Sequence, residues 1–337
     1  MKLKAAVIGT GRIGYLLQKD KKREQPASHA AALAKNPRIR LAAACDINPQ
    51  KLAAWSKDYP RTACYTSAET LMQTENPDLV VVAVSESAHT EVALTVIRYK
   101  PRLVILEKPV APEPAAAEKI RKAAARFHVP VCVNHERRFS ADYLTAKRII
   151  DNGGLGTLQR IDAHLWSGAP VWSKTCVESG NCSLIHDGTH LVDALHFLLS
   201  TRLSDPAADR ITRDKKKAVR VLNLHYHLPR NVLLYLEFNG QSKVFDFEIT
   251  VTGSEGKLVI GNGYLKQYTR AASPFYSGFY SLKRLRGVGR PRITGYFSGM
   301  VQNCVDFLAG TSPLVSPLSE GIRALKALFE IVACLQN

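Results

Sequence analysis

The sequence of 337 residues lacks any long hydrophobic run. Its longest uninterrupted apolar segment spans residues 79–84, far short of the ~20 residues that a membrane-spanning helix requires. The first residues, MKLKAAVIGTGRIG, reach glycine after a short apolar stretch, which is not the pattern of a secretory signal peptide. We therefore expect a cytoplasmic protein without a membrane partner.

Cysteines are few, widely spaced and without a C-x-x-C pair. Their number is seven, whereas a disulfide framework needs an even number at short, regular spacings. We therefore expect reduced and mostly buried thiols. The histidines form no recognised metal-binding motif, so no metal is predicted.

Acidic residues are too few to balance the basic ones. The sequence has 29 Asp and Glu against 46 Lys and Arg, a net charge of +17. Such an excess favours an anionic partner, such as a nucleic acid, a membrane surface or a phosphorylated ligand. No helix-turn-helix, zinc-finger or RNA-binding signature is present, so a nucleic-acid partner is not expected.

The length predicts about two domains. In the first third, short apolar segments alternate with segments rich in Ala, Leu, Lys and Glu, which is the pattern of strands separated by helices. Near-continuous apolar strands of this kind form a parallel sheet covered on both faces. Strands are expected at residues 4–8, 40–45, 78–84, 102–106 and 129–133.

The pattern changes after residue 133. Helical periodicity at 140–151 and 184–199 flanks a strand at 157–166, and several alternating strands then follow one another without helices. Residues 270–296 are expected to form a long loop before two closing helices at 297–308 and 319–335. The sequence predicts an α/β fold: a doubly wound Rossmann sheet in residues 1–133, and an α+β domain with a mainly antiparallel, open sheet in residues 134–337. The last helix could pack back on the first domain.

A glycine-rich turn directly follows the first predicted strand. Its G-x-G-x-x-G pattern, between a strand and a helix, is typical of a dinucleotide site. The glycines allow a tight turn and close approach of the pyrophosphate, and a helix N-terminus offers amides to the phosphates. A plain turn is the alternative. The predicted cofactor-binding residues are Gly9, Thr10, Gly11, Arg12, Ile13 and Gly14.

Asp46 closes the second predicted strand. A carboxylate there accepts hydrogen bonds from ribose hydroxyls and repels a 2′-phosphate, which favours NAD over NADP, although Lys51 lies nearby. The alternative is an aspartate that caps the helix beginning near Pro49. Asp46 follows Gly14 by more than the about 20 residues usual in such sites. We attribute the surplus to a basic insertion at residues 18–28.

Three later segments carry polar side chains suited to catalysis. Residues 107–109 (EKP) and 134–139 (NHERRF) follow the fourth and fifth strands, at the sheet edge where ligands bind. The helix expected at 184–199 carries His186, His190 and Asp193 on one face. A lysine and a histidine beside a nicotinamide would suit alcohol oxidation, which needs a base for the hydroxyl proton and a cation near the developing carbonyl oxygen.

Together these motifs resemble the Gfo/Idh/MocA family, which includes glucose–fructose oxidoreductase and inositol dehydrogenase. The resemblance rests on GTGRIG at 9–14, the strand ending in Asp46, EKP at 107–109 and H-x-x-D at His190 and Asp193. The segments NGGLG at 152–156 and GSEGK at 253–257, with the closing helix, extend it over essentially the whole chain.

The resemblance implies an NAD(P)-dependent oxidoreductase that transfers hydride between nicotinamide and a secondary hydroxyl or carbonyl of a sugar, cyclitol or sugar derivative. It also implies a homodimer or homotetramer formed through the second-domain sheet. By position, Lys108 is the lysine that holds the substrate hydroxyl near the nicotinamide. His190 is the acid/base residue, and Asp193 falls on the family's following carboxylate. Ser85, Glu107 and Lys108 are expected beside the cofactor.

The sequence departs from the family at two places. Family members often have Asp four residues before the active-site histidine, where this chain has His186 and then Asp187. Either His186 joins the proton relay, or Asp187 turns in through a local distortion of the helix. At Ser85 and Glu86, family members commonly have a Thr-Pro-like turn by the cofactor.

Basic residues are the candidates for substrate binding. Arg137 and Arg138 could bind substrate oxygens, or could pair with Glu107 or Glu136. Seven cations and no carboxylate fall within residues 264–300. Arg286 in this segment could contact an anionic substrate, and a basic solvated surface is the alternative.

Two other functions fit the same motifs. An NAD-using glycosidase of the family would oxidise its substrate only transiently. A non-catalytic regulator that senses a dinucleotide or another ligand belongs to a different class, and the presence of both Lys108 and His190 argues against it.

Overall fold

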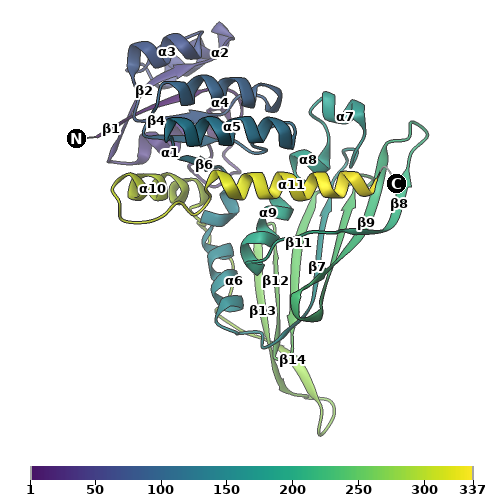
Figure 1. Ribbon diagram of the computed structural model, residues 1–337. Helices are drawn as coiled ribbons and strands as arrows, with labels where there is room; N and C mark the ends of the chain where they lie inside the picture. The colour runs from purple at the N-terminus through teal and green to yellow at the C-terminus, as the bar shows by residue number, and fades with distance from the viewer. Residues whose placement is uncertain (1, 336–337) are drawn as a thin grey trace. The chain divides into compact units, whose positions relative to one another are not determined.

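The computed structural model describes residues 2–335. The chain forms two compact units, one of Met1–Phe139 with Gly295–Leu325 and the other of Ser140–Thr294 with Lys326–Asn337. The last helix, α11 (Leu318–Cys334), contributes residues to both (Figure 1). Within the described residues, no helix is both long and apolar enough to span a bilayer.

The first unit contains a parallel sheet of six strands in the order β3-β2-β1-β4-β5-β6. This is the doubly wound Rossmann order, and it confirms the predicted fold of the first part of the chain. The short β3 was not predicted, because a three-residue strand is too short to show a periodic pattern. The strands are β1 (Leu3–Ile8), β2 (Ile39–Cys45), β3 (Ala63–Tyr65), β4 (Leu79–Val82), β5 (Leu103–Leu106) and β6 (Val131–Val133).

Helices connect these strands, and several begin at a side-chain cap. The Asn48 side chain accepts hydrogen bonds from the first amides of α2, and the Ser67 side chain does the same for α3. The helices of the crossovers are α1 (His29–Lys35), α2 (Pro49–Asp58), α3 (Ala68–Glu75), α4 (His89–Arg98) and α5 (Pro114–Phe127).

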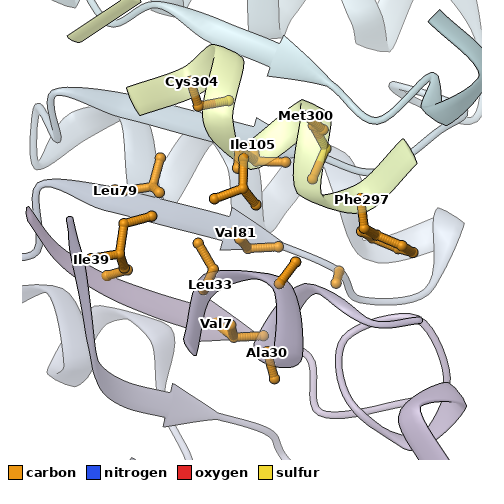
Figure 2. Close-up of a cluster of buried hydrophobic side chains, with 14 of the residues drawn as sticks. Val7, Ala30, Leu33, Ile39, Leu79, Val81, Ile105, Phe297, Met300 and Cys304 are labelled. Atoms are coloured by element: carbon orange, nitrogen blue, oxygen red, sulfur yellow. The ribbon is translucent and has the colours of Figure 1, made fainter. Parts of the chain in front are cut away.

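Helix α10 (Tyr296–Leu308) also packs in the first unit, although only the last helix was predicted to pack back on the first domain. Its buried side chains recur at helical spacing and form one apolar face. Figure 2 shows Phe297 and Met300 in the same cluster as Val81 and Ile105 of the sheet. Burial of this face against the parallel sheet explains why a segment late in the chain belongs to the first unit.

The second unit contains a sheet of eight strands in the order β14-β13-β12-β11-β7-β10-β9-β8. Only the β7–β10 pair is parallel among its described neighbours, which confirms the predicted mainly antiparallel sheet. Its strands are β7 (Leu158–Trp166), β8 (Ala207–Arg213), β9 (Val219–Leu228), β10 (Val232–Asn239), β11 (Asp246–Gly253), β12 (Gly256–Gly261), β13 (Tyr264–Ala272) and β14 (Tyr280–Arg284).

The predicted loop at 270–296 is wrong in part, because β13 continues to Ala272 and β14 follows it. Both edge strands, β8 and β14, were missed. Their side chains are largely exposed, so neither strand has the alternation of apolar and polar residues that marks a half-buried strand.

The helix predicted at 184–199 is two helices, α8 (Ser183–His186) and α9 (Gly188–Leu199). Asp187 ends the first and precedes the second. Gly188 disfavours a continuous helix, and the Phe238 ring would lie 3.0 Å from a Cβ at that position. The other helices of this unit are α6 (Ala141–Asp151) and α7 (Lys174–Glu178).

Candidate active site

The three glycines of the turn after β1 serve different structural purposes. A Cβ on Gly9 would lie 2.3 Å from the Ala83 carbonyl oxygen, and one on Gly14 would lie 1.9 Å from the Gly9 carbonyl oxygen. A Cβ on Gly11 would meet nothing within 4 Å. The first and third glycines are therefore required for packing, whereas the second leaves backbone open to a ligand, as a dinucleotide pyrophosphate requires.

The helix expected directly after this turn is absent, which corrects the predicted phosphate-binding helix N-terminus. Residues 11–15 form turns, and a short 3-10 helix, η1 (Leu16–Lys19), follows them. The α-helix begins only at His29, where the His29 and Ala30 amides donate to the carbonyls of Ile13 and Gly14. Residues 15–28 therefore form an insertion between the glycine turn and the first crossover helix, and these hydrogen bonds join its two ends.

Asp46 lies beside the glycine turn at the end of β2. Its Oδ2 accepts hydrogen bonds from the Thr10 amide at 2.9 Å and the Thr10 hydroxyl at 3.0 Å, and its Oδ1 accepts one from the Asn48 amide at 3.0 Å. The Lys51 ammonium lies 3.9 Å from Oδ2. The alternative role as a helix cap is wrong, because Asn48 caps α2.

The cofactor candidates differ in exposure. Thr10 is fully buried, whereas the Arg12 side chain is exposed and Ile13 is half-buried. Ser85 is exposed and follows the neighbouring strand β4, with its hydroxyl 3.3 Å from that of Ser87. Among these candidates, the side chains of Arg12 and Ser85 are thus the most exposed.

Glu107 begins the loop after β5 and is the centre of a buried network. Its amide donates to the Val82 carbonyl, and the Asn134 amide donates to the Leu106 carbonyl, which extends the sheet by one residue at this edge. Glu107 Oε1 lies 2.6 Å from His29 Nε2 and accepts a hydrogen bond of 2.6 Å from the Asn134 side-chain amide.

The network keeps Glu107 ionised. Burial acts to raise the pKa of its carboxyl group, but hydrogen bonds from His29 and Asn134 and the charges of His29 and Lys108 outweigh burial. The pKa of Glu107 is therefore lower than its usual value. The buried Glu107 carboxylate therefore places a negative charge next to Lys108.

Lys108 is half-buried and follows Glu107 at the sheet edge. Its amide donates to Glu107 Oε2 at 3.3 Å, and the Lys108–Pro109 peptide bond is cis. The buried His89 ring holds the same loop, with Nδ1 2.7 Å from the Pro109 carbonyl oxygen and Nε2 3.2 Å from that of Val84. Both flanks of Lys108 are thus anchored.

The two arginines after β6 lie in different environments. Arg138 is buried, and its guanidinium donates to Glu320 at 2.9 Å and to the Val315 carbonyl at 3.3 Å. Arg137 lies 3.7 Å from the Glu136 carboxylate. Arg138 therefore anchors the start of α11, and its predicted contact with substrate has no support in this geometry.

In the second unit, the predicted catalytic residues stand on either side of Asp187. His186 ends α8 and is exposed, whereas His190 lies in α9, and Asp187 between the two helices keeps right-handed helical dihedrals. His186 Nε2 lies 4.0 Å from Asp187 Oδ1, and the His190 amide donates to the Asp187 carbonyl. His190 is half-buried and Asp193 is buried.

Two residues of the Glu107 network were missed in the sequence. His29 follows the insertion, and no spacing rule connects it with a residue 78 positions later. Asn134 stands in a segment singled out for its polar residues, and its position after β6 was a signal for a side chain at the sheet edge. Arg286 is exposed just after β14.

All seven cysteines are free, and five are buried, in line with the expected buried thiols; they are Cys45, Cys132, Cys176, Cys182 and Cys304. The exposed Cys64 and the half-buried Cys334 are the exceptions.

The doubly wound sheet and its glycine turn define a dinucleotide-binding protein of the Rossmann type. Two family models match the chain: "Oxidoreductase family, NAD-binding Rossmann fold" over residues 3–135, and "GFO/IDH/MocA C-terminal domain" over residues 143–259. The chain belongs to the Gfo/Idh/MocA oxidoreductase family.

Named relatives agree with this assignment. An uncharacterized oxidoreductase of Schizosaccharomyces pombe is 29% identical over 42% of this chain and 39% of its own length. Inositol 2-dehydrogenase of Salmonella typhimurium is 25% identical over 59% of this chain and 55% of its own. The chain thus spans about half the length of the curated relatives it matches.

The fold is that of solved oxidoreductases. A structure from Agrobacterium radiobacter, in complex with NAD+, L-tartaric acid and magnesium, superposes with a TM-score of 0.78. The match covers 100% of this chain and 97% of the solved chain, and the two sequences are 16% identical.

Proposed function

We propose that the protein is an NAD-dependent dehydrogenase that oxidises a secondary hydroxyl of a sugar, cyclitol or sugar derivative. The observation that carries this proposal is the carboxyl edge of the parallel sheet. The open backbone at Gly11 follows β1, and the anchored Lys108 follows β5; both strands flank β4. The candidate dinucleotide site and the candidate catalytic lysine therefore lie at the same carboxyl edge of the parallel sheet.

The residues around the turn fit a dinucleotide. Backbone near Gly11 would hold the pyrophosphate, and Asp46 would hold the adenosine ribose. Three hydrogen bonds keep the Asp46 carboxylate from turning away, so a 2′-phosphate would meet its charge directly. This supports NAD over NADP, although the Lys51 ammonium would partly offset the repulsion of a 2′-phosphate.

When bound, the nicotinamide would accept or return the hydride. In the proposed reaction, Lys108 donates a hydrogen bond to the substrate hydroxyl and stabilises negative charge on its oxygen. His190 accepts the hydroxyl proton, and Asp193 supports the imidazole. His186 and Asp187, which adjoin the helix break, are proposed to pass that proton onward.

The experiment is a substrate screen. Purified protein with NAD+ is offered neutral, phosphorylated and nucleotide-linked sugars and cyclitols, and NADH absorbance is followed. We expect Lys108→Ala to lower kcat on the best substrate by on the order of 10²-fold or more, with little change in NAD affinity. Lys119→Ala, an exposed lysine of α5, is the matched control and should leave kcat unchanged.

The outcomes separate the competing functions. Equal loss of NAD affinity and kcat in Lys108→Ala would contradict the role given to this lysine. Release of a sugar without net NADH would indicate the NAD-using glycosidase. NAD binding with no turnover across the panel would favour the ligand-sensing regulator. A cytoplasmic location, an oligomer formed through the eight-stranded sheet and contact of Arg137 or Arg286 with an anionic substrate remain predictions.

A further inference from the structure

A β-hairpin stands at one edge of the second unit's sheet. Strand β14 pairs with β13 from Ala272↔Tyr280 to Tyr268↔Arg284, and residues 273–279 form the connecting loop. Figure 1 shows this hairpin projecting from the sheet edge. Strand β14 is the last strand of the sheet, so no described strand covers its outer edge.

The end of the hairpin carries four exposed aromatic side chains, which we call the aromatic tip. Phe275 is 80% exposed, Tyr276 70%, Phe279 68% and Tyr280 62%. Folding leaves these large apolar rings in water, where they gain nothing from burial. Contiguous exposed apolar groups of this size mark sites that meet a protein or a membrane.

Exposed cations follow the aromatic tip directly. Lys283 and Arg284 lie on β14, and Arg286 follows the strand; we call these three residues the basic stem. Among the described residues, none of the three is within ion-pair distance of a carboxylate. No Asp or Glu occurs in residues 264–300, so no residue nearby in the sequence balances the positive charge of the basic stem.

We propose that this hairpin docks on an anionic lipid surface. The aromatic tip would enter the boundary between headgroups and acyl chains, and the basic stem would bind lipid phosphates. At about 3.4 Å per strand residue, Lys283 and Arg284 lie about 10 to 14 Å along the strand from Tyr280. Interfacial elements insert about 5–10 Å, so this separation puts the cations at the headgroups when the rings are inserted.

The arrangement of the rings favours lipid over single-stranded nucleic acid. A nucleic-acid platform needs open ring faces with cations beside them. Here the rings contact one another at a steep angle, with Tyr276 and Phe279 centroids 6.2 Å apart and their planes inclined by 72°. The Arg270 guanidinium already covers the Tyr280 ring at 3.8 Å. Rings at the end and free cations behind them match a bilayer interface instead.

The proposal departs from the expectation of no membrane partner. That expectation rested on the absence of long apolar runs, which concerns spanning helices and not docking on a surface. The net charge of +17 supports docking, because long-range attraction to anionic lipid adds to the contacts of the hairpin.

The test is binding of the full chain to sedimented vesicles at physiological salt. We expect binding to vesicles of phosphatidylcholine with one third phosphatidylglycerol, and little binding to phosphatidylcholine alone. The double variant Lys283→Glu/Arg284→Glu should lower the partition coefficient by at least about 25-fold, since each cation contributes about fivefold. The triple variant Phe275→Ser/Tyr276→Ser/Phe279→Ser should lower it at least about tenfold.

Matched controls separate the hairpin from general charge and hydrophobicity. Lys119→Glu/Lys122→Glu changes the net charge equally on α5, and Phe245→Ser removes another exposed ring. Phe245→Ser should bind anionic vesicles as the unaltered chain does. Lys119→Glu/Lys122→Glu should lose far less binding than the variant of the basic stem, because it changes only the long-range attraction. Thermal unfolding checks that each variant is folded, and only variants with an unchanged melting temperature are compared.

Three results would overturn the proposal. The first is equal binding of the tip and stem variants and the unaltered chain to anionic vesicles. The second is a changed oligomeric state of the triple variant in size-exclusion chromatography, which would assign the aromatic tip to an interface between copies. The third is hairpin-dependent binding of a single-stranded oligonucleotide without binding to vesicles.

Discussion

His29 and Glu107 form a buried pair in which imidazole Nε2 lies 2.6 Å from carboxylate Oε1. His29 is the first residue of α1, and Glu107 directly precedes Lys108. The pair therefore connects the helix that resumes after the insertion with the loop that carries the proposed catalytic lysine. The position of Lys108 depends on a residue that the reaction itself does not use.

Removal of His29 should destabilise the protein strongly. His29→Leu leaves the Glu107 charge buried with one partner fewer, and loss of one partner of a buried pair costs about 3–5 kcal/mol. Urea unfolding measures the change in free energy of unfolding. His29→Leu/Glu107→Leu should recover part of the loss, because it buries no charge. If the double variant is less stable than His29→Leu by the full cost of a second core substitution, the two side chains are not coupled.

The Glu107 carboxylate should also make stability depend on pH. Its pKa is lower in the folded protein, so its contribution is present above the unfolded pKa of about 4.3 and is lost as pH falls through the folded value. Between about pH 5 and pH 3, stability should fall more steeply for the unaltered chain than for Glu107→Gln. Urea midpoints at several pH values measure the two slopes, and parallel curves would contradict the assignment.

The glycine turn offers a test that separates packing from ligand binding. A Cβ at Gly14 overlaps the Gly9 carbonyl oxygen, so Gly14→Ala should lower stability by about 1–3 kcal/mol or more. A Cβ at Gly11 has open space, so Gly11→Ala should unfold as the unaltered chain does but bind NAD at least about tenfold more weakly. Thermal unfolding and NAD titration together measure both effects. Unchanged NAD affinity in Gly11→Ala would show that the pyrophosphate does not approach there.

Asp46 should control the choice between NAD and NADP. Asp46→Ser removes the charge that opposes a 2′-phosphate and leaves Lys51 to attract it. We expect the ratio of NADP to NAD affinity to rise by at least about tenfold. Lys51→Ala in the same background should reverse part of the gain. A variant that loses affinity for both cofactors equally would indicate that Asp46 acts only by holding Thr10.

The sequence predicted those parts of the fold whose residues repeat a local pattern. Strands such as β4, with all four residues buried, are visible as apolar runs between helices. The exposed strand β14 has no such run and was assigned to a loop. The order of strands follows from the βαβ units, whereas the packing of α10 in the first unit depends on contacts with distant residues.

The candidate site follows the same rule. Gly9, Gly11 and Gly14 and the EKP loop could be predicted because their spacing and their place after strands are local features. A local helix distortion at Asp187 was one of two alternatives in the sequence, whereas the close approach of Phe238 to Gly188 is visible only in the folded chain. His29 and Asn134 meet Glu107 only in the folded chain, so no motif contains all three.

The insertion at residues 15–28 begins at the glycine turn and returns to it. Because the amides of His29 and Ala30 bond to the carbonyls of Ile13 and Gly14, the chain returns to the point where it departed. The two ends of the insertion are part of the fold, because Tyr15 is buried and Ser28 caps α1. The exposed residues 19–23 between them are a natural position for exchange: a shorter, longer or labelled segment could replace them while the cofactor turn and the His29–Glu107 pair keep their places.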